Sequence, residues 1–203
     1  MVPAPVFFLS RRSDWRAIGD WFRAGNAAGF PAEFAYALAE IPTRRPPEEA
    51  RRLHRLKGRP ETKPVLYLAG SLEIVARFAS LPSDPVRRRI LDQGPRFLTC
   101  LLPARGLATA LGMAHSGKVA FRIPADPVLR AFLLYLGEPL SGTSLNRSGD
   151  PPLRSLEEIR RVFPDLAVVD GGFRPGAPVS PILDLTRFDR PVRRRSWRSL
   201  SIS

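Results

Sequence analysis

Apolar residues recur along much of the chain at the spacing of one helix face, and stop signals bound each such stretch. Trp15, Ile18 and Phe22 lie on one face of a helix that begins at Ser13 and ends before Gly25. Local signals mark several of the other helices: Asp126 precedes and Gly137 follows one, Ser155 with Glu158 forms a capping box for another, and Gly58 ends a third. The remaining predicted helices run from Pro46 to before Gly58, Leu72–Phe78, Pro85–Leu91, Pro127–Leu136 after Asp126, and Ser155–Phe163.

Short apolar runs bounded by turn residues alternate with these helices and predict strands. The first run ends in a bend at Pro31 and continues beyond it. The predicted strand segments are Ala27–Phe30, Phe34–Leu38, Pro64–Ala69, Phe97–Leu102, Val119–Ile123, Leu140–Thr143, Leu166–Val169, Ile182–Leu185 and Val192–Trp197. Alternation of this kind is typical of an α/β domain with a mixed sheet. At 203 residues, with no internal repeat or linker, we expect a single domain.

Composition narrows the class of protein without identifying it. Apolar residues make up 44% of the chain and charged residues 25%, which is enough to build a core. No apolar run reaches the roughly 18 residues that a membrane span needs, so we expect a cytoplasmic protein with no membrane partner. Cys100 is the only cysteine, which excludes an internal disulfide and a cysteine-based zinc site.

The formal net charge of +13 favours polyanionic partners. Phosphates of a nucleotide or of RNA both fit, as does a solvated arginine-rich surface with no partner. Lys57 and Arg59 flank one glycine, with Lys63 close behind, so that three cations can converge on a polyphosphate. Basic residues also complement the dipole at a helix end, and that alternative stays open. The loop from Gly142 to Gly149 is rich in hydroxyl and amide donors and follows a predicted strand, where open α/β sheets bind ligands.

Six segments, taken in order, resemble the YrdC-like family of threonylcarbamoyl-adenylate synthases, which includes YciO-like paralogues. The resemblance covers roughly residues 14–197. It is carried by Phe30 to Leu38, Lys57-Gly58-Arg59-Pro60 with Lys63-Pro64, Thr99 to Pro103, Val119 to Pro124 with Asp126-Pro127, Gly137 to Gly149, and Asp170-Gly171-Gly172 with Ser180 to Leu185.

The resemblance implies an α/β fold: one YrdC-like domain over residues 1–203, with a twisted open mixed sheet, flanking helices and a concave basic groove. It also implies an activity that joins L-threonine, bicarbonate and ATP into threonylcarbamoyl-adenylate and releases pyrophosphate. The product supplies tRNA threonylcarbamoyladenosine modification through a downstream threonylcarbamoyl-transferase complex. Mg²⁺ is expected to accompany ATP, with no direct protein ligand.

The same resemblance assigns site residues. Lys57 and Arg59 are expected to be catalytic and, with Lys63, to bind the polyphosphate of ATP. The other residues expected at ATP are Ser144, Asn146, Arg122, Ser180 and Arg195. Those expected to shape the threonine pocket are Pro31, Glu33 and Tyr36.

Departures from the family pattern keep two alternatives open. Ala32 stands where the family has a threonine, Ala37 where it has a glycine, and Leu145 where it has an alanine. These changes fall mostly on the amino-acid side, and some resemble the YciO-like paralogues. The first alternative is therefore a paralogue with weak or altered acyl-adenylate chemistry. The second is a protein without catalysis that binds RNA, either tRNA or double-stranded RNA.

Overall fold

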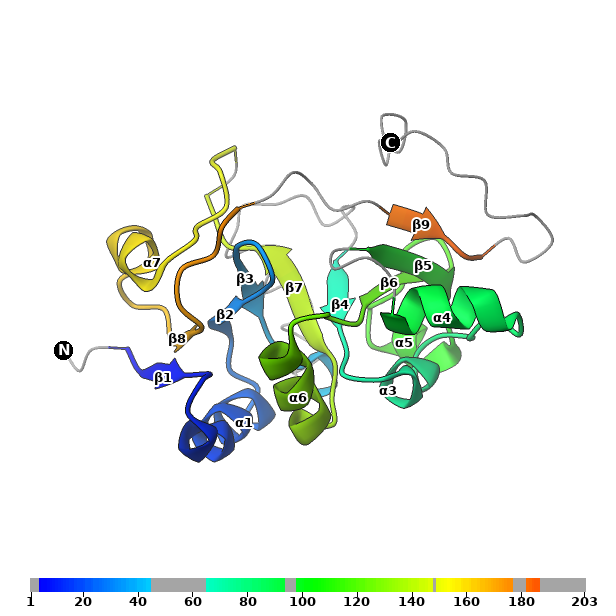
Figure 1. Cartoon of the computed structure of the whole chain (residues 1–203), viewed down its shortest axis with the longest axis horizontal. Helices are drawn as coiled ribbons and strands as arrows, with labels where there is room; N and C mark the ends of the chain where they lie inside the picture. The colour runs from blue at the N-terminus through cyan, green and yellow to red at the C-terminus, as the bar shows by residue number, and fades with distance from the viewer. Residues whose placement is uncertain (1–3, 45–64, 94–97, 148, 177–181, 187–203) are drawn as a thin grey trace.

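The computed structural model describes residues 4–44, 65–93, 98–147, 149–176 and 182–186, and within them nine strands form one open mixed sheet (Figure 1). The strand order is β1-β8-β2-β3-β7-β4-β6-β5-β9. The strands are β1 Val6–Phe8, β2 Ala28–Pro31, β3 Tyr36–Ala39, β4 Leu66–Leu68, β5 Thr99–Pro103, β6 Lys118–Arg122, β7 Leu140–Ser144, β8 Val168–Asp170 and β9 Ile182–Asp184. Four of the pairings are parallel (β1 with β8, β8 with β2, β4 with β6, β5 with β9) and the others antiparallel.

Short helices connect the strands, and their ends follow from local sequence. They are α1 Trp15–Arg23, α3 Leu72–Ala76, α4 Pro85–Gln93, α5 Gly106–Ala110, α6 Pro127–Leu136 and α7 Leu156–Val162, with 3₁₀ turns η1 Arg12–Asp14 and η2 Pro42–Arg44. At the start of α6 the Asp126 carboxylate accepts hydrogen bonds from the backbone N–H groups of Val128 and Leu129. Gly137 ends α6 at a φ of 70°, a backbone conformation that favours glycine. The sequence therefore fixes both ends of this helix.

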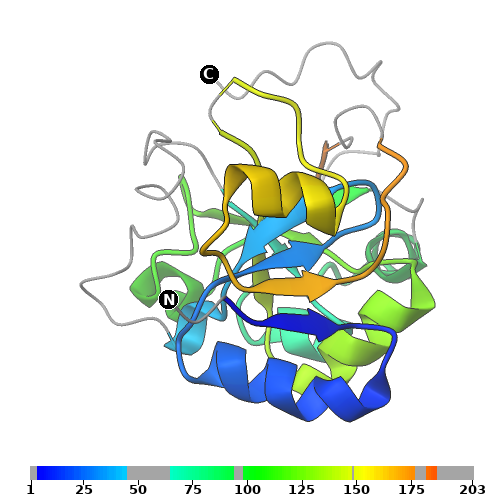
Figure 2. The ribbon, with the colours of Figure 1, turned by 90° about the vertical axis from the view of Figure 1, so that its left-hand side faces the viewer.

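Helices cover both faces of the β1-β8-β2-β3 part of the sheet (Figure 2). On one face α1 and α6 pack together over the sheet, with Ile18, Phe22, Phe30 and Phe132 fully buried in a shared core. On the other face α7 packs through Ile159, in a smaller cluster whose members are Ala27, Tyr36, Leu38, Leu145, Ile159 and Val168. Successive strand residues point to opposite faces, so a single strand serves both cores.

A separate core fills the other half of the molecule. Helices α3, α4 and α5 pack around β4, β5 and β6 through buried residues that include Val75, Phe78, Leu102 and Phe121. Cys100 lies in this core and is 1% exposed, and burial raises the pKa of its thiol to about 12. The cysteine therefore packs as an apolar residue.

The predicted fold class is confirmed, and most predicted elements are present within a few residues of their expected ends. The segment around Pro31 is a hairpin of β2 and β3 rather than one bent strand. Strand β1 and helix α5, both too short for a periodic signal, were not predicted from the sequence. The helix from Pro46 and the strand at 192–197 fall outside the described residues, and the single domain and the basic groove remain predictions. Within the described ranges, no helix combines the length and apolar character needed to cross a bilayer.

Candidate functional site

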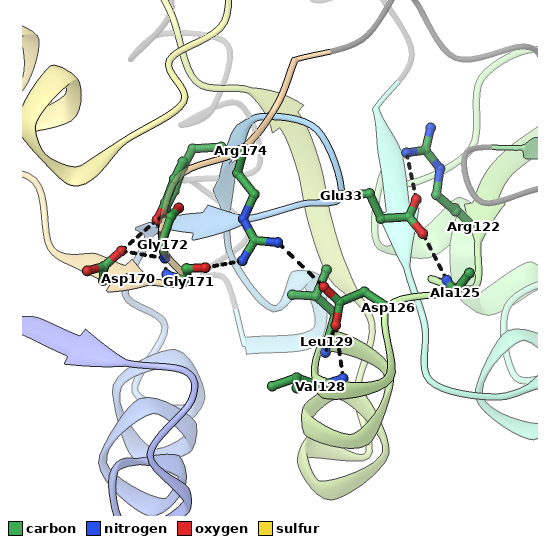
Figure 3. A network of polar contacts seen from close by, with 11 residues as sticks. Glu33, Arg122, Ala125, Asp126, Val128, Leu129, Asp170, Gly171, Gly172 and Arg174 are labelled. Carbon is green, nitrogen blue, oxygen red and sulfur yellow. Dashed lines mark hydrogen bonds and ion pairs between the residues drawn. The ribbon is translucent and has the colours of Figure 1, made fainter.

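A buried ion pair joins the β2–β3 turn to the end of β6. The Glu33 carboxylate lies 3.8 Å from Nη1 of Arg122, and each side chain is 7% exposed (Figure 3). Glu33 also accepts a hydrogen bond from the backbone N–H of Ala125 at 2.9 Å, and Arg122 donates one to the Thr99 hydroxyl at 2.8 Å. These bonds fix both side chains in place. The turn, the start of β5 and the segment before α6 therefore meet at one point.

The hydrogen bonding of this pair is incomplete. Oε2 of Glu33 and Nε of Arg122 are both buried and have no hydrogen-bond partner among the described residues. Burial raises the pKa of the Glu33 carboxyl, against the opposing effects of the Ala125 N–H and the Arg122 charge. Burial likewise lowers the pKa of the Arg122 guanidinium. Buried polar atoms are nearly always satisfied, so this pair offers an acceptor and a donor that suit a small polar ligand.

A second ion pair lies between the loop after β8 and the start of α6. Nη1 of Arg174 is 3.4 Å from the Asp126 carboxylate, which also caps α6, and Nη2 donates to the Gly171 carbonyl (Figure 3). The Arg174 side chain is 12% exposed, and its Nε is buried without a hydrogen-bond partner in the part of the chain that the structure describes. Gly171 packs against Pro31 so closely that a Cβ there would lie 2.6 Å from the proline Cβ. Arg174 thus holds this loop against both α6 and the β2–β3 hairpin.

Tyr36 connects the same loop to β3. Its hydroxyl accepts from the backbone N–H of Gly171 at 3.0 Å, and it lies 2.8 Å from the Asp170 carboxylate and 3.0 Å from the Gly172 carbonyl. Burial raises the pKa of Tyr36 well above its ordinary value, and the Asp170 carboxylate raises it further. The hydroxyl is therefore a neutral donor at physiological pH that fixes the loop beside Pro31.

The hydroxyl-rich loop after β7 is more exposed than these pairs. The exposed Ser144 hydroxyl lies 3.1 Å from Oδ1 of Asn146, whose amide donates to the Asp150 carbonyl at 2.6 Å. Between them, the backbone N–H of Leu145 donates to the Tyr36 carbonyl at 2.8 Å. This backbone bond ties the loop to the strand that carries Tyr36, so the two predicted side chains have a defined position.

The strand register separates Ser144 from the backbone of Arg122 along the sheet. Leu68 of β4 pairs with both Arg122 of β6 and Leu140 of β7, so Arg122 and Leu140 lie at one level. Ser144 is four residues further along β7, or about 13 Å at 3.3 Å per strand residue. Ser144 also pairs with Ala37 of β3, four residues after Glu33, so Glu33 lies nearer to the Ser144 level. The contact between Glu33 and Arg122 therefore spans the two levels.

Five of the eleven residues predicted to form the site fall outside the described part of the chain, namely Lys57, Arg59, Lys63, Ser180 and Arg195. The structure places the other six as described above: it pairs Glu33 with Arg122, sets Pro31 and Tyr36 against the loop after β8, and presents Ser144 and Asn146 beyond β7. The sequence reasoning did not select Arg174, because no local motif marks its pairing with an aspartate 48 residues away. In the described ranges, no three His, Cys, Asp or Glu side chains cluster to hold a metal ion.

Known structures share this fold. The chain is similar to E. coli YciO, with a TM-score of 0.75 at 21% identity, covering 90% of this chain and 91% of that one. It is also similar to P. abyssi Sua5 in a structure complexed with L-threonine, with a TM-score of 0.73 at 24% identity, covering 90% of this chain. The match spans 54% of that archaeal chain.

Sequence comparison identifies the family. The threonylcarbamoyl-AMP synthase of Neisseria gonorrhoeae is 30% identical over 171 residues, which cover 83% of this chain and 89% of that enzyme. The enzyme of the same name from Marinobacter nauticus is 32% identical over 166 residues, with 80% and 86% covered. Residues 20–196 match the family described as telomere recombination, which groups Sua5, YciO and YrdC. The chain therefore belongs to the Sua5/YciO/YrdC family.

Proposed function

We propose that the chain is a threonylcarbamoyl-AMP synthase, an enzyme that makes threonylcarbamoyl-adenylate from L-threonine, bicarbonate and ATP and acts in tRNA modification. The relatives that bear this name match most of the chain, and their names support a transferase of this kind. The structural observation that carries the proposal is the buried Glu33–Arg122 pair, which leaves one acceptor and one donor unsatisfied. An amino acid presents the complementary donor and acceptor.

On the amino-acid side, the guanidinium of Arg122 suits a carboxylate, and Oε2 of Glu33, the oxygen nearest Arg122, suits a donor such as the threonine hydroxyl or N–H. Pro31 and Tyr36 are assigned to the border of the threonine pocket. They pack against or bond to the loop after β8, so their contribution is the placement of that loop. This arrangement keeps the pair rigid before the ligand binds.

On the nucleotide side, we assign polyphosphate binding to Lys57, Arg59 and Lys63, and contacts with ATP to Ser144 and Asn146. Ser180 and Arg195 complete the predicted nucleotide side. A Mg²⁺ ion that arrives with ATP would be held by phosphate oxygens and water, with no direct protein ligand, because Mg²⁺ prefers oxygen ligands and keeps several waters. Such an ion would supply charge neutralisation on the polyphosphate.

The proposed chemistry needs positioning and charge stabilisation rather than a protein nucleophile. Threonine and bicarbonate first give the carbamate with loss of water. A carbamate oxygen then attacks the α-phosphorus of ATP, and the bond from that phosphorus to the bridging oxygen breaks to release pyrophosphate. The attack brings two anions together, so the site must offset their repulsion. Lys57 and Arg59 are assigned this catalytic role, and Arg122 holds the carbamate end.

The test is pyrophosphate release from ATP in the presence of bicarbonate and each amino acid in turn. We expect release with threonine, and none when bicarbonate or the amino acid is left out. In the Lys57→Ala variant we expect nucleotide binding weaker by about 1 to 3 kcal/mol, the strength of a charged hydrogen bond. The same ATP affinity in that variant would remove Lys57 from the site. Cytoplasmic location and a downstream transferase complex are part of this proposal.

Ala32 favours a second candidate, a paralogue with altered acyl-adenylate chemistry. Its backbone N–H donates to the Ala35 carbonyl at 2.9 Å, which closes the turn that carries Glu33. At this position the family has a threonine hydroxyl, and alanine leaves only a methyl group. The Ala32→Thr variant should lower the KM for threonine if the natural chain is a weakened synthase. Turnover with another amino acid or carboxylate, and none with threonine, would establish the paralogue instead.

A further inference from the structure

The loop at residues 171–176, which follows β8, is held in place at several points. The backbone N–H of Arg174 donates to the Arg154 carbonyl, and that of Gly176 donates to the Phe34 carbonyl, both at 2.8 Å. The loop turns at Gly172 and Gly176, whose φ values are 79° and 76°. Figure 1 shows this segment in orange as it passes the β2–β3 turn. The Arg174 side chain points inward, so the chain on either side has a fixed position.

Phe173 in this anchored loop remains in solvent. Its side chain is 65% exposed, the most of any large apolar residue in the described ranges. The Arg154 guanidinium lies over its ring, 5.3 Å from the centroid. Among the described residues, the Arg154 side chain has no carboxylate partner within ion-pair distance. The fixed loop thus presents an aromatic ring beside a cation from the segment before α7.

We propose that Phe173 and Arg154 form a stacking site for an unpaired base of an RNA strand. Bases that are not in a duplex stack on aromatic rings and on guanidinium planes, and a nearby cation takes the adjacent phosphate. A mononucleotide is less suited, because small-molecule sites enclose most of the ligand, whereas this ring stays mostly exposed. The net charge of +13 draws a polyanion to the surface as a whole.

The proposed RNA site adjoins the candidate functional site without being part of it. Gly172, the residue before Phe173, accepts a hydrogen bond from the Tyr36 hydroxyl at 3.0 Å. A strand bound at Phe173 would therefore lie next to the loop that borders the amino-acid side. RNA binding here goes beyond the proposed synthase activity, and the two can be tested separately.

The experiment measures the Kd for a fluorescein-labelled single-stranded RNA of about 12 nucleotides, a length within the usual site size, at several salt concentrations. We expect Phe173→Ala to weaken binding by about 10-fold at every salt concentration, since stacking is not ionic, and Phe173→Trp to restore it. Arg154→Gln should weaken binding and reduce the salt slope by about one. The matched controls are Leu107→Ala and Arg16→Gln, at exposed positions on α5 and α1. They should change the Kd and the salt slope less than the Phe173 and Arg154 variants do.

Three results would overturn the proposal. The first is equal RNA affinity in the Phe173→Ala and Leu107→Ala variants. The second is an equal loss on a duplex of the same length, whose bases are already stacked. The third is a loss of ATP affinity in Phe173→Ala with no loss of RNA affinity, which would assign the ring to the nucleotide substrate. Pyrophosphate release without RNA should be unchanged in Phe173→Ala, so failure of this site is separable from failure of the proposed activity.

Discussion

The two ends of the candidate site differ in how much the fold depends on them. At one end Glu33 and Arg122 are almost fully buried and join three segments that are distant in sequence. At the other end, Ser144 is exposed and Asn146 partly so, and the Ser144 hydroxyl and the Asn146 amide both contact atoms of the same loop. The buried end therefore has a structural role beside the ligand contact proposed for it, whereas the exposed end is proposed to contact the nucleotide.

This difference has an electrostatic cause. A charge removed from water loses its hydration, and only its partner and hydrogen bonds offset that loss. Burial therefore raises the pKa of Glu33 and lowers that of Arg122, although each charge opposes the other's shift. An exposed hydroxyl has no comparable cost. The contrast predicts that substitutions at the buried end change both folding and binding, whereas those at the exposed end change binding alone.

The largest expected effect is the loss of one member of the buried pair. Arg122→Met leaves the Glu33 carboxylate buried without a cation, which should lower the free energy of unfolding by about 3 to 5 kcal/mol in urea denaturation. The double variant with Glu33→Gln as well removes both charges and should cost less than Arg122→Met alone. A loss in the double variant equal to the sum of the Arg122→Met and Glu33→Gln losses would show that the two charges are not coupled.

A substitution at Gly171 tests the packing that supports this end. A Cβ on Gly171 would lie 2.6 Å from Cβ of Pro31 and would also contact the Arg174 guanidinium. Because Pro31 belongs to β2, the loop must shift, and Gly171→Ala should destabilise the protein by about 1 to 3 kcal/mol. Gly106→Ala is the matched control, since a Cβ there has no atom within 4 Å. Similar melting temperatures for the two variants would mean that the loop adapts freely.

The Lys118–Asp184 pair, between β6 and β9, provides an intermediate case. Its two side chains are 36% and 32% exposed, with Nζ of Lys118 at 2.7 Å from the carboxylate. Burial acts to raise the pKa of Asp184, but hydrogen bonds from Lys118 and Thr186 outweigh it and lower the pKa. A lowered folded-state pKa stabilises the protein above the unfolded-state pKa, and the stabilisation disappears as the pH falls through the folded-state value.

Asp184→Asn should therefore lower the free energy of unfolding by about 1 kcal/mol at neutral pH, less than at the buried pair. The difference between the variant and the natural chain should shrink below about pH 4, where the carboxylate of the unfolded chain is protonated. Urea denaturation across this pH range measures it. A difference that grows on acidification would contradict the direction assigned to this pKa.

The sequence was sufficient for elements whose signals are local. Helix α6 has its aspartate cap, first-turn proline and final glycine within a short stretch, and it begins and ends where these residues predict. Strand β1 and helix α5 have three and five residues, too few for a periodic pattern. The β2–β3 hairpin was predicted only as a bend, because its turn lacks the Asn-Gly or Asp-Gly signal.

The candidate site divides in the same way. Motif resemblance selected Glu33 and Arg122 separately, but their pairing across 89 residues depends on the arrangement of the sheet. Arg174 is a clearer example of a contact that the sequence does not predict. Its partner Asp126 is already explained by its role as the cap of α6, so nothing in the sequence calls for a second partner. Neither pairing has a spacing that a single sequence reveals. Contacts of this kind follow from tertiary structure alone.

The smallest expected effect on folding is at the exposed end, and it completes the comparison. Ser144→Ala removes a hydroxyl that lies 3.1 Å from Oδ1 of Asn146 on an exposed loop, so the free energy of unfolding should change by less than about 0.5 kcal/mol. If the hydroxyl contacts ATP, the KM for ATP should rise by about 5- to 10-fold, the equivalent of one hydrogen bond of about 1 kcal/mol. Ser13→Ala is the matched control, because its exposed hydroxyl likewise bonds a neighbouring side chain, Asp14, at 3.2 Å. An unchanged KM for ATP would remove Ser144 from the nucleotide side, and a large loss of stability would show that this loop is as structural as the buried pair.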